Sequence, residues 1–120
     1  MQEVCFLIGR GDVILWSDAS GSPVALPDSR ARWEAIWGSR KKLVEIAHSH
    51  PVGPRAFSHE DETTMEALYS ALGSRIAFSV VAPNGMIRRK KKRERTIDAL
   101  VEEEPWWTAL LRRASHMKEK

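Results

Sequence analysis

The sequence predicts a single-domain α/β protein in which strands and helices alternate along the chain. Short apolar runs of strand length recur, apolar residues at helical spacing separate them, and glycine or proline marks the junctions. The chain has 120 residues, of which 42% are hydrophobic, which suffices for one modest core. We therefore expect one domain that spans residues 1–120.

The first half should hold a hairpin, a helix and a third strand. Residues 4–9 are an apolar run, and residues 12–17 follow a turn at Arg10 and Gly11. Residues 18–27 read as loop, and Asp28 or Ser29 can cap a helix that ends near Gly38. We expect this helix to pack on the sheet through its apolar face, which carries Trp33, Ile36 and Trp37.

The second half should hold two helices and another hairpin. Residues 58–72 predict a helix with Met65 and Leu68 facing inward and Gly73 at its end. Strands are expected at 75–82 and from Met86 into the basic run, with a turn between them. A last helix should cover 105–117, begin at Pro105 and end before a few frayed residues. Its buried side should comprise Trp106, Trp107, Leu110 and Leu111.

Composition narrows the environment and the partners of the protein. One cysteine excludes an intrachain disulfide, and no apolar run approaches membrane-spanning length, so we expect a cytoplasmic protein without a membrane partner. The net charge of +3 is concentrated in residues 88–95, where seven basic residues accompany one acid. This run is either a solvated strand end or loop, or a patch for an acidic partner; nucleic acid is a weaker alternative. The basic residues are Arg88, Arg89, Lys90, Lys91, Lys92, Arg93 and Arg95.

The segment around His48 and His50 has the pattern of a metal site. Two histidines that are two residues apart on a strand point to the same face, and Pro51 then stops the strand. A helix start at Ser58 places Asp61 in its first turn. Two imidazoles and one carboxylate leave the fourth position of a catalytic zinc open. His48, His50 and Asp61 are therefore the candidate metal ligands, at one Zn²⁺ per chain.

The pattern His-x-His-x7-Ser-x2-Asp, which includes Pro51 here, resembles the motif of the JAMM metalloproteases, also called the JAB or MPN domain. The resemblance implies a mixed, mostly antiparallel sheet flanked by helices, in a small prokaryotic-type stand-alone member. It implies a zinc peptidase or isopeptidase that acts after the C-terminal tail of a ubiquitin-like or sulfur-carrier protein. It also implies that Ser58 stabilises the oxyanion.

A zinc hydrolase also needs a carboxylate that moves protons. Glu3 matches the family's glutamate, because it precedes a cysteine and an apolar run that closes at Gly9, although Phe6 replaces the usual glycine. A base this close to a chain end needs its strand to be tied into the sheet. Three other glutamates fit less well: Glu45 should point to the opposite strand face, Glu60 should point away from Asp61, and Glu34 lies at an undetermined angle.

Each site residue also has a purely structural interpretation. Ser58 and Asp61 suit a helix start in any protein, and Glu3 can be a solvated terminal glutamate. Cys5 is expected to be a buried small hydrophobe. The alternative function is a non-catalytic MPN-like module that binds protein or nucleic acid through residues 88–95, including a role like that of the DNA-associated RadC branch.

Overall fold

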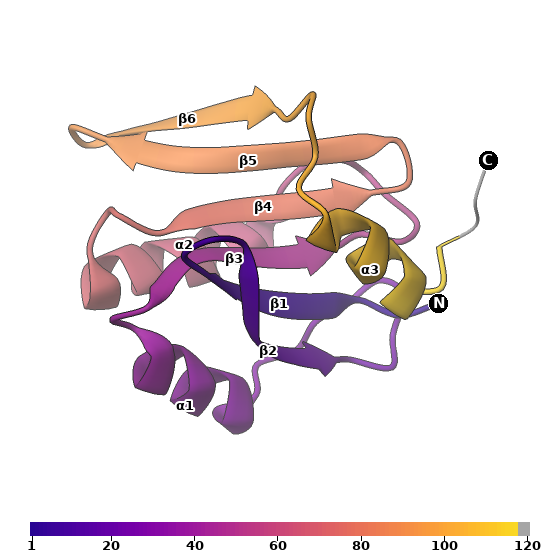
Figure 1. The fold of residues 1–120 in the computed structure, drawn as a ribbon, viewed down its shortest axis with the longest axis horizontal. Helices are drawn as coiled ribbons and strands as arrows, with labels where there is room; N and C mark the ends of the chain where they lie inside the picture. Colours follow the sequence, from indigo (N-terminus) through magenta and orange to yellow (C-terminus); the bar gives the residue numbers. More distant parts are fainter. Residues whose placement is uncertain (118–120) are drawn as a thin grey trace.

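The computed structural model describes residues 1–117, which form one six-stranded sheet and three helices (Figure 1). The fraying expected at the chain end concerns residues 118–120, outside the described range. The strands are β1 (Val4–Gly9), β2 (Val13–Ala19), β3 (Leu43–Ser49), β4 (Ala77–Ala82), β5 (Gly85–Lys92) and β6 (Arg95–Leu100). The helices are α1 (Arg30–Ser39), α2 (His59–Leu72) and α3 (Trp107–Ala114).

The strand order is β2-β1-β3-β4-β5-β6. Within residues 1–117, only the β3–β4 pair is parallel, because α2 provides the crossover between these two strands. This arrangement confirms the mixed, mostly antiparallel sheet flanked by helices. None of the helices in residues 1–117 is long and apolar enough to cross a membrane.

The two faces of the sheet carry separate apolar clusters. Helices α1 and α2 cover one face through Ile36, Met65 and Leu68, which pack on apolar side chains of β1, β3 and β4. Helix α3 crosses the other face, and its Trp107 and Leu111 are fully buried there (Figure 1). The core is therefore two thin layers, and the sheet is common to both.

The prediction for the last helix was only partly correct. The helix spans Trp107–Ala114, because His116 has a left-handed backbone (φ 57°) that ends it. Trp106 and Leu110 are 59% and 41% exposed, so their predicted burial was wrong. Each lies one residue, or about 100°, around the helix from a buried neighbour, which turns it toward solvent.

Helix α1 follows Ser29, whose hydroxyl accepts from the Arg32 amide and so selects this cap over Asp28. Ile36 is buried and Trp33 is half-buried, as predicted. Trp37 is 55% exposed, with the Arg40 guanidinium 4.1 Å from its ring centre, so its assignment to the buried face was wrong.

The basic run forms the end of one strand, a turn and the start of the next, and Lys90, Lys92, Arg93 and Arg95 are exposed, as expected for a solvated strand end. Strand β5 turns at Arg93 and Glu94, which both have positive φ, and β6 follows as a strand that the sequence analysis missed. Arg88 donates to the Glu45 carboxylate at 2.9 Å, and Arg89 to Asp98 at 2.6 Å. Both of these arginines therefore have carboxylate partners within the fold.

The Arg88–Glu45 pair gives a prediction for stability. Glu45 is buried, so Arg88→Met should leave a buried carboxylate without its partner and lower the free energy of unfolding by about 2–4 kcal/mol. Lys90→Met, two residues along the same strand face, is the matched control and should change it by less than about 0.5 kcal/mol. Urea unfolding of both variants measures the difference. Equal stabilities would show that the pair is not structural.

Candidate metal centre

The end of β3 brings His48 and His50 together. His50 directly follows the strand, and its amide donates to the Val81 carbonyl at 2.9 Å, which continues the parallel pairing with β4. The two imidazole Nε2 atoms are 3.1 Å apart. The side chains of both histidines are largely shielded from solvent. Two nitrogen donors therefore converge on one point, as the two-residue spacing predicts.

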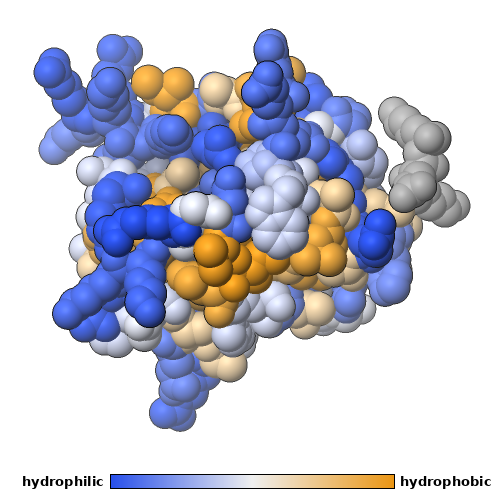
Figure 2. Space-filling model, in the orientation of Figure 1, coloured by the Kyte–Doolittle hydropathy of each residue, from blue (hydrophilic) through white to orange (hydrophobic). Residues whose placement is uncertain are grey.

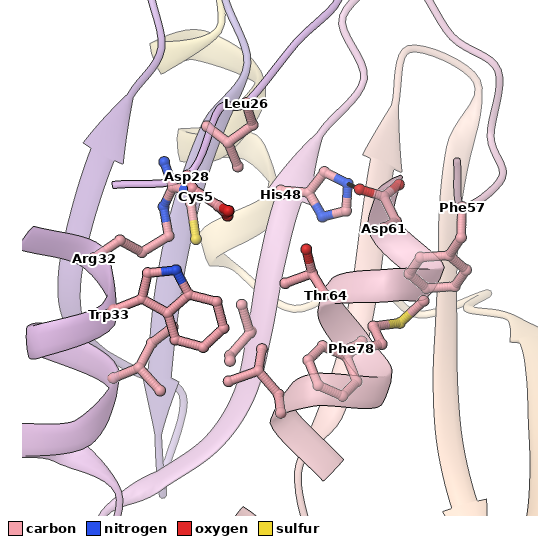
Figure 3. Close-up of a pocket in the computed structure, with 14 residues that line it drawn as sticks. Cys5, Leu26, Asp28, Arg32, Trp33, His48, Phe57, Asp61, Thr64 and Phe78 are labelled. Carbon is pink, nitrogen blue, oxygen red and sulfur yellow. Dashed lines mark ion pairs between the residues drawn. The ribbon is translucent and has the colours of Figure 1, made fainter. Parts of the chain in front are cut away.

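The first turn of α2 brings Asp61 to the same point. Ser58 Oγ accepts from the Asp61 amide at 3.1 Å, and Asp61 Oδ2 accepts from the Ser58 amide at 2.7 Å, which forms a complete capping box. The Asp61 carboxylate also lies 3.1 Å from His48 Nε2 and 3.4 Å from His50 Nε2. Figure 3 shows the Asp61 carboxylate facing the His48 ring. The Asp61 side chain therefore both completes the cap of α2 and lies against the two histidines.

The loop after Pro51 determines which nitrogen of His50 is available. His50 Nδ1 lies 2.9 Å from the Pro54 carbonyl oxygen, which can only accept. Nδ1 must therefore carry the proton, and the lone pair of a neutral His50 is on Nε2, on the side of His48 and Asp61. A metal ligand held in this way by a carbonyl is a common arrangement in metal sites.

Glu3, the residue directly before β1, reaches the same cluster. Its carboxylate oxygen and the ligand atoms of His48 and His50 all lie within 4.8 Å of one another. The residue is buried, and its backbone is bonded on both sides: its amide donates to the Ser22 carbonyl at 2.7 Å, and its carbonyl accepts from the Ser20 amide at 2.9 Å. The condition that the sequence set for Glu3, a strand tied into the sheet, is met.

Burial and charge shift the pKa values of three of these groups. Burial raises the pKa of Glu3, against the effect of the two histidines. Burial alone would also raise the pKa of Asp61, but hydrogen bonds to the imidazoles and to Ser58 hold it far below its ordinary value. Burial opposes charge on His50, yet the Asp61 and Pro54 hydrogen bonds leave its pKa raised. The cluster therefore keeps one carboxylate ionised and a second one easier to protonate.

The chemistry and spacing of these donors fit zinc. Ligands at about 2.0–2.1 Å from a tetrahedral zinc are roughly 3.3 Å from one another. His48 Nε2 lies 3.1 Å from His50 Nε2 and 3.1 Å from Asp61 Oδ1, and His50 Nε2 lies 3.4 Å from Asp61 Oδ2. Glu3 falls within the wider 4.8 Å limit. The two histidines therefore have two carboxylates close enough to complete a metal-ligand set, Asp61 and Glu3.

The remaining sequence candidates lie away from the cluster. Glu45 points to the opposite face and binds Arg88, as strand alternation predicts. Glu34 is exposed and pairs with Arg30, which removes it as a candidate base. His59 and His116 are exposed. Cys5 is 1% exposed, and burial raises the pKa of its thiol to about 12, so it behaves as the expected hydrophobe.

Sequence analysis missed the residues that hold β1 in place. Ser49, between the two histidines, accepts from the Val4 amide at 2.9 Å and from the Ser115 hydroxyl at 2.6 Å. The Ser115 carbonyl in turn accepts from the Gln2 amide at 3.1 Å. The residues on either side of Glu3 are thus anchored to β3 and to the end of α3. No spacing rule in the sequence links positions 4, 49 and 115.

A cleft opens onto the cluster. One wall carries His50, Ser58 and Asp61, and Glu3 also faces it. The other wall is the irregular segment 24–27, which precedes α1. On the other side of His48, the site borders a cavity between β1, α1 and α2 (Figure 3). The cluster is therefore reachable from solvent through a groove.

A family model described as prokaryotic homologs of the JAB domain matches residues 4–99, more than half of the chain. The match includes His48, His50, Ser58 and Asp61, begins one residue after Glu3, and ends before α3. It agrees with the resemblance inferred from the motif. No curated protein matches the chain at a significant level.

The Ser49 hydroxyl gives a prediction for the anchoring of β1. Ser49→Ala should leave the buried Val4 amide without an acceptor and lower the free energy of unfolding by about 1–3 kcal/mol. Ser79→Ala is the control, because its hydroxyl is equally buried but has no hydrogen-bond partner among the described residues. Urea unfolding gives the stability, and hydrogen exchange should show faster exchange at Val4. Unchanged exchange there would contradict the anchor.

Proposed function

The chain belongs to the family of prokaryotic homologs of the JAB domain, and we propose that it is a zinc-dependent peptidase or isopeptidase. The observation that carries this proposal is the convergence of His48, His50 and Asp61 at 3.1–3.4 Å, with Glu3 beside them. The substrate we propose is an amide bond after the C-terminal tail of a ubiquitin-like or sulfur-carrier protein. The motif resemblance supports this substrate class.

Each residue has a distinct proposed role. His48, His50 and Asp61 hold the metal, which when bound polarises the scissile carbonyl and lowers the pKa of a coordinated water. Glu3 accepts the proton of the attacking water and passes it to the leaving amine. Ser58 Oγ accepts from the Asp61 amide, so its own proton is free to be donated to the carbonyl oxygen as negative charge develops there.

The cleft supports an extended substrate. Segment 24–27 forms no strand or helix, and it faces the catalytic residues across the groove. An extended tail in this groove could pair with the backbone of that segment, as strands add to free backbone edges elsewhere. The end of the tail would then lie between Glu3 and Ser58, where the proposed chemistry takes place.

The ligand assignment gives a prediction about metal content. The purified chain should bind about one zinc, and His48→Ala, His50→Ala and Asp61→Asn should each lose most of it, because the first two remove a donor and the third replaces a charged carboxylate with a neutral, weaker amide oxygen. Asp61→Asn is preferred to alanine because its amide oxygen can still cap α2. His59→Ala and Glu60→Gln, exposed neighbours on the same helix, are the controls. Elemental analysis measures the outcome, and full zinc occupancy in the Asp61 variant would contradict the assignment.

Glu3 gives a separate prediction about turnover. Glu3→Gln keeps the size of the side chain but cannot accept a proton, so kcat should fall by about 10²- to 10⁴-fold while zinc stays bound. Cleavage of a ubiquitin-like fusion, with zinc content and the circular dichroism spectrum measured in parallel, tests this. Glu60→Gln, which also lines the cleft, should keep its activity. If the Glu3 variant loses zinc, Glu3 is a fourth ligand and the proposed division of roles fails.

The alternative of a non-catalytic binding module is tested by the same assay. It is favoured only by the basic run, in which Arg88 and Arg89 are already paired within the fold. An acidic partner at the remaining basic residues stays a proposal. A zinc-loaded chain that cleaves no ubiquitin-like fusion, with or without chelator, would favour the non-catalytic binding module.

A further inference from the structure

Strand β6 leaves one edge of the sheet open, and we propose that it pairs with β6 of a second copy of this chain to form a two-fold symmetric dimer. β6 is the terminal strand of the sheet, and all six of its residues are exposed. A free strand edge presents unpaired backbone N–H and C=O groups to any strand that can match them. The inference does not depend on the proposed catalytic activity.

The opposite edge of the sheet is protected. β2 lies beside a register shift between Leu7 and Ile8 of β1, which bends the pair. Helix α1 packs next to β2, and Arg32 binds Asp18 of that strand at 2.7 Å. Within residues 1–117, β6 has neither a bulge in its pairing nor a helix beside it. It is therefore the edge that is available.

The hairpin determines which backbone groups of β6 point outward. Lys92 and Arg95 close the two-residue turn, and the Val101 amide donates to the Met86 carbonyl at 2.9 Å in the same ladder. In an antiparallel pair the hydrogen-bonded positions alternate, so Arg95, Ile97 and Ala99 bond inward to β5. Thr96, Asp98 and Leu100 therefore direct their backbone groups away from the sheet.

This alternation of inward-bonding and outward-bonding residues in β6 selects a register for self-pairing. An antiparallel copy can bond only outward position to outward position, and a two-fold axis at Ile97 satisfies this by placing Thr96 opposite Asp98 of the second copy. The same axis brings the two Ile97 side chains together as a non-hydrogen-bonded pair, in which side chains approach closely. Ile97 is 56% exposed and would be covered by this contact.

The charges on either side of β6 are complementary in this orientation. Basic residues precede the strand, with Lys92 and Arg93 at the turn, and the acids Glu102 and Glu103 follow it. All four are exposed. Antiparallel pairing places the acidic end that follows β6 of the second copy beside the basic turn that carries Arg93, whereas parallel pairing would align ends of like charge. Figure 2 shows apolar patches between long hydrophilic side chains along the edge where β6 runs in Figure 1.

The contact is short, so the dimer should be weak. Two six-residue strands bury less than the ~1,000 Å² or more of a stable interface, and we expect a dissociation constant on the order of 100 µM. The metal cluster involves β1, β3 and α2, which are separated from β6 by β4 and β5. Pairing therefore leaves the groove at the metal cluster open in both copies.

Cysteine cross-linking tests the register. Ile97→Cys places a thiol on the proposed axis, and the native Cys5 is too buried to interfere. Under mild oxidation this variant should form disulfide-linked dimers at least ten times faster than Val13→Cys, whose position at the far edge is 53% exposed. Ala99→Cys, two residues along the same face of β6, should also be slow. Equal rates for Ile97→Cys and Val13→Cys would overturn the proposal.

A charge exchange tests the orientation. Arg93→Glu and Glu102→Lys should each weaken self-association about tenfold in sedimentation equilibrium, and the double variant should restore it, because opposite charges face each other again. Lys42→Glu, an exposed lysine remote from β6 in the sheet, should have no effect. A wild-type chain that stays monomeric at about 1 mM would overturn the proposal, and so would a dimer that neither single variant weakens.

Discussion

The reciprocal capping box of Ser58 and Asp61 is the interaction on which the candidate metal centre depends. It satisfies the free amides at the start of α2 and holds the Asp61 carboxylate against the imidazoles of β3. A helix that began one residue earlier or later would turn this carboxylate by about 100° and remove it from the cluster. Helix stability and donor geometry therefore share the same two hydrogen bonds.

The second constraint is the position of β1. Its start is held by Ser49 of β3, by the carbonyl of Ser115 at the end of α3, and by the segment that follows β2. Helix α3 lies outside the region that the family model matches, yet it contributes to the anchoring of the residues around Glu3. The burial of Trp107 and Leu111 thus contributes to the site indirectly, by holding α3 against the sheet.

The local features of the fold and the site could be predicted from the sequence because they depend on short-range rules. The two-residue spacing of His48 and His50, the cap at Ser58 and the apolar runs all act within a few residues. The Ser49–Ser115 contact, the pairing of Arg88 with Glu45 and the exposure of Trp37 depend on distant segments, so no local pattern indicates them. Strand β6 was missed for a related reason: its exposed residues lack the alternation that marks a half-buried strand.

The segment between β2 and α1 both holds Glu3 in place and lines the groove. Through Ser20 and Ser22 it bonds to both sides of Glu3, and a few residues later, at 24–27, it forms the outer wall of the groove. A ligand that displaces this wall would also strain the two backbone hydrogen bonds that Ser20 and Ser22 make with Glu3. We therefore expect the fit of a ligand against this short peptide segment to affect the position of the Glu3 carboxylate.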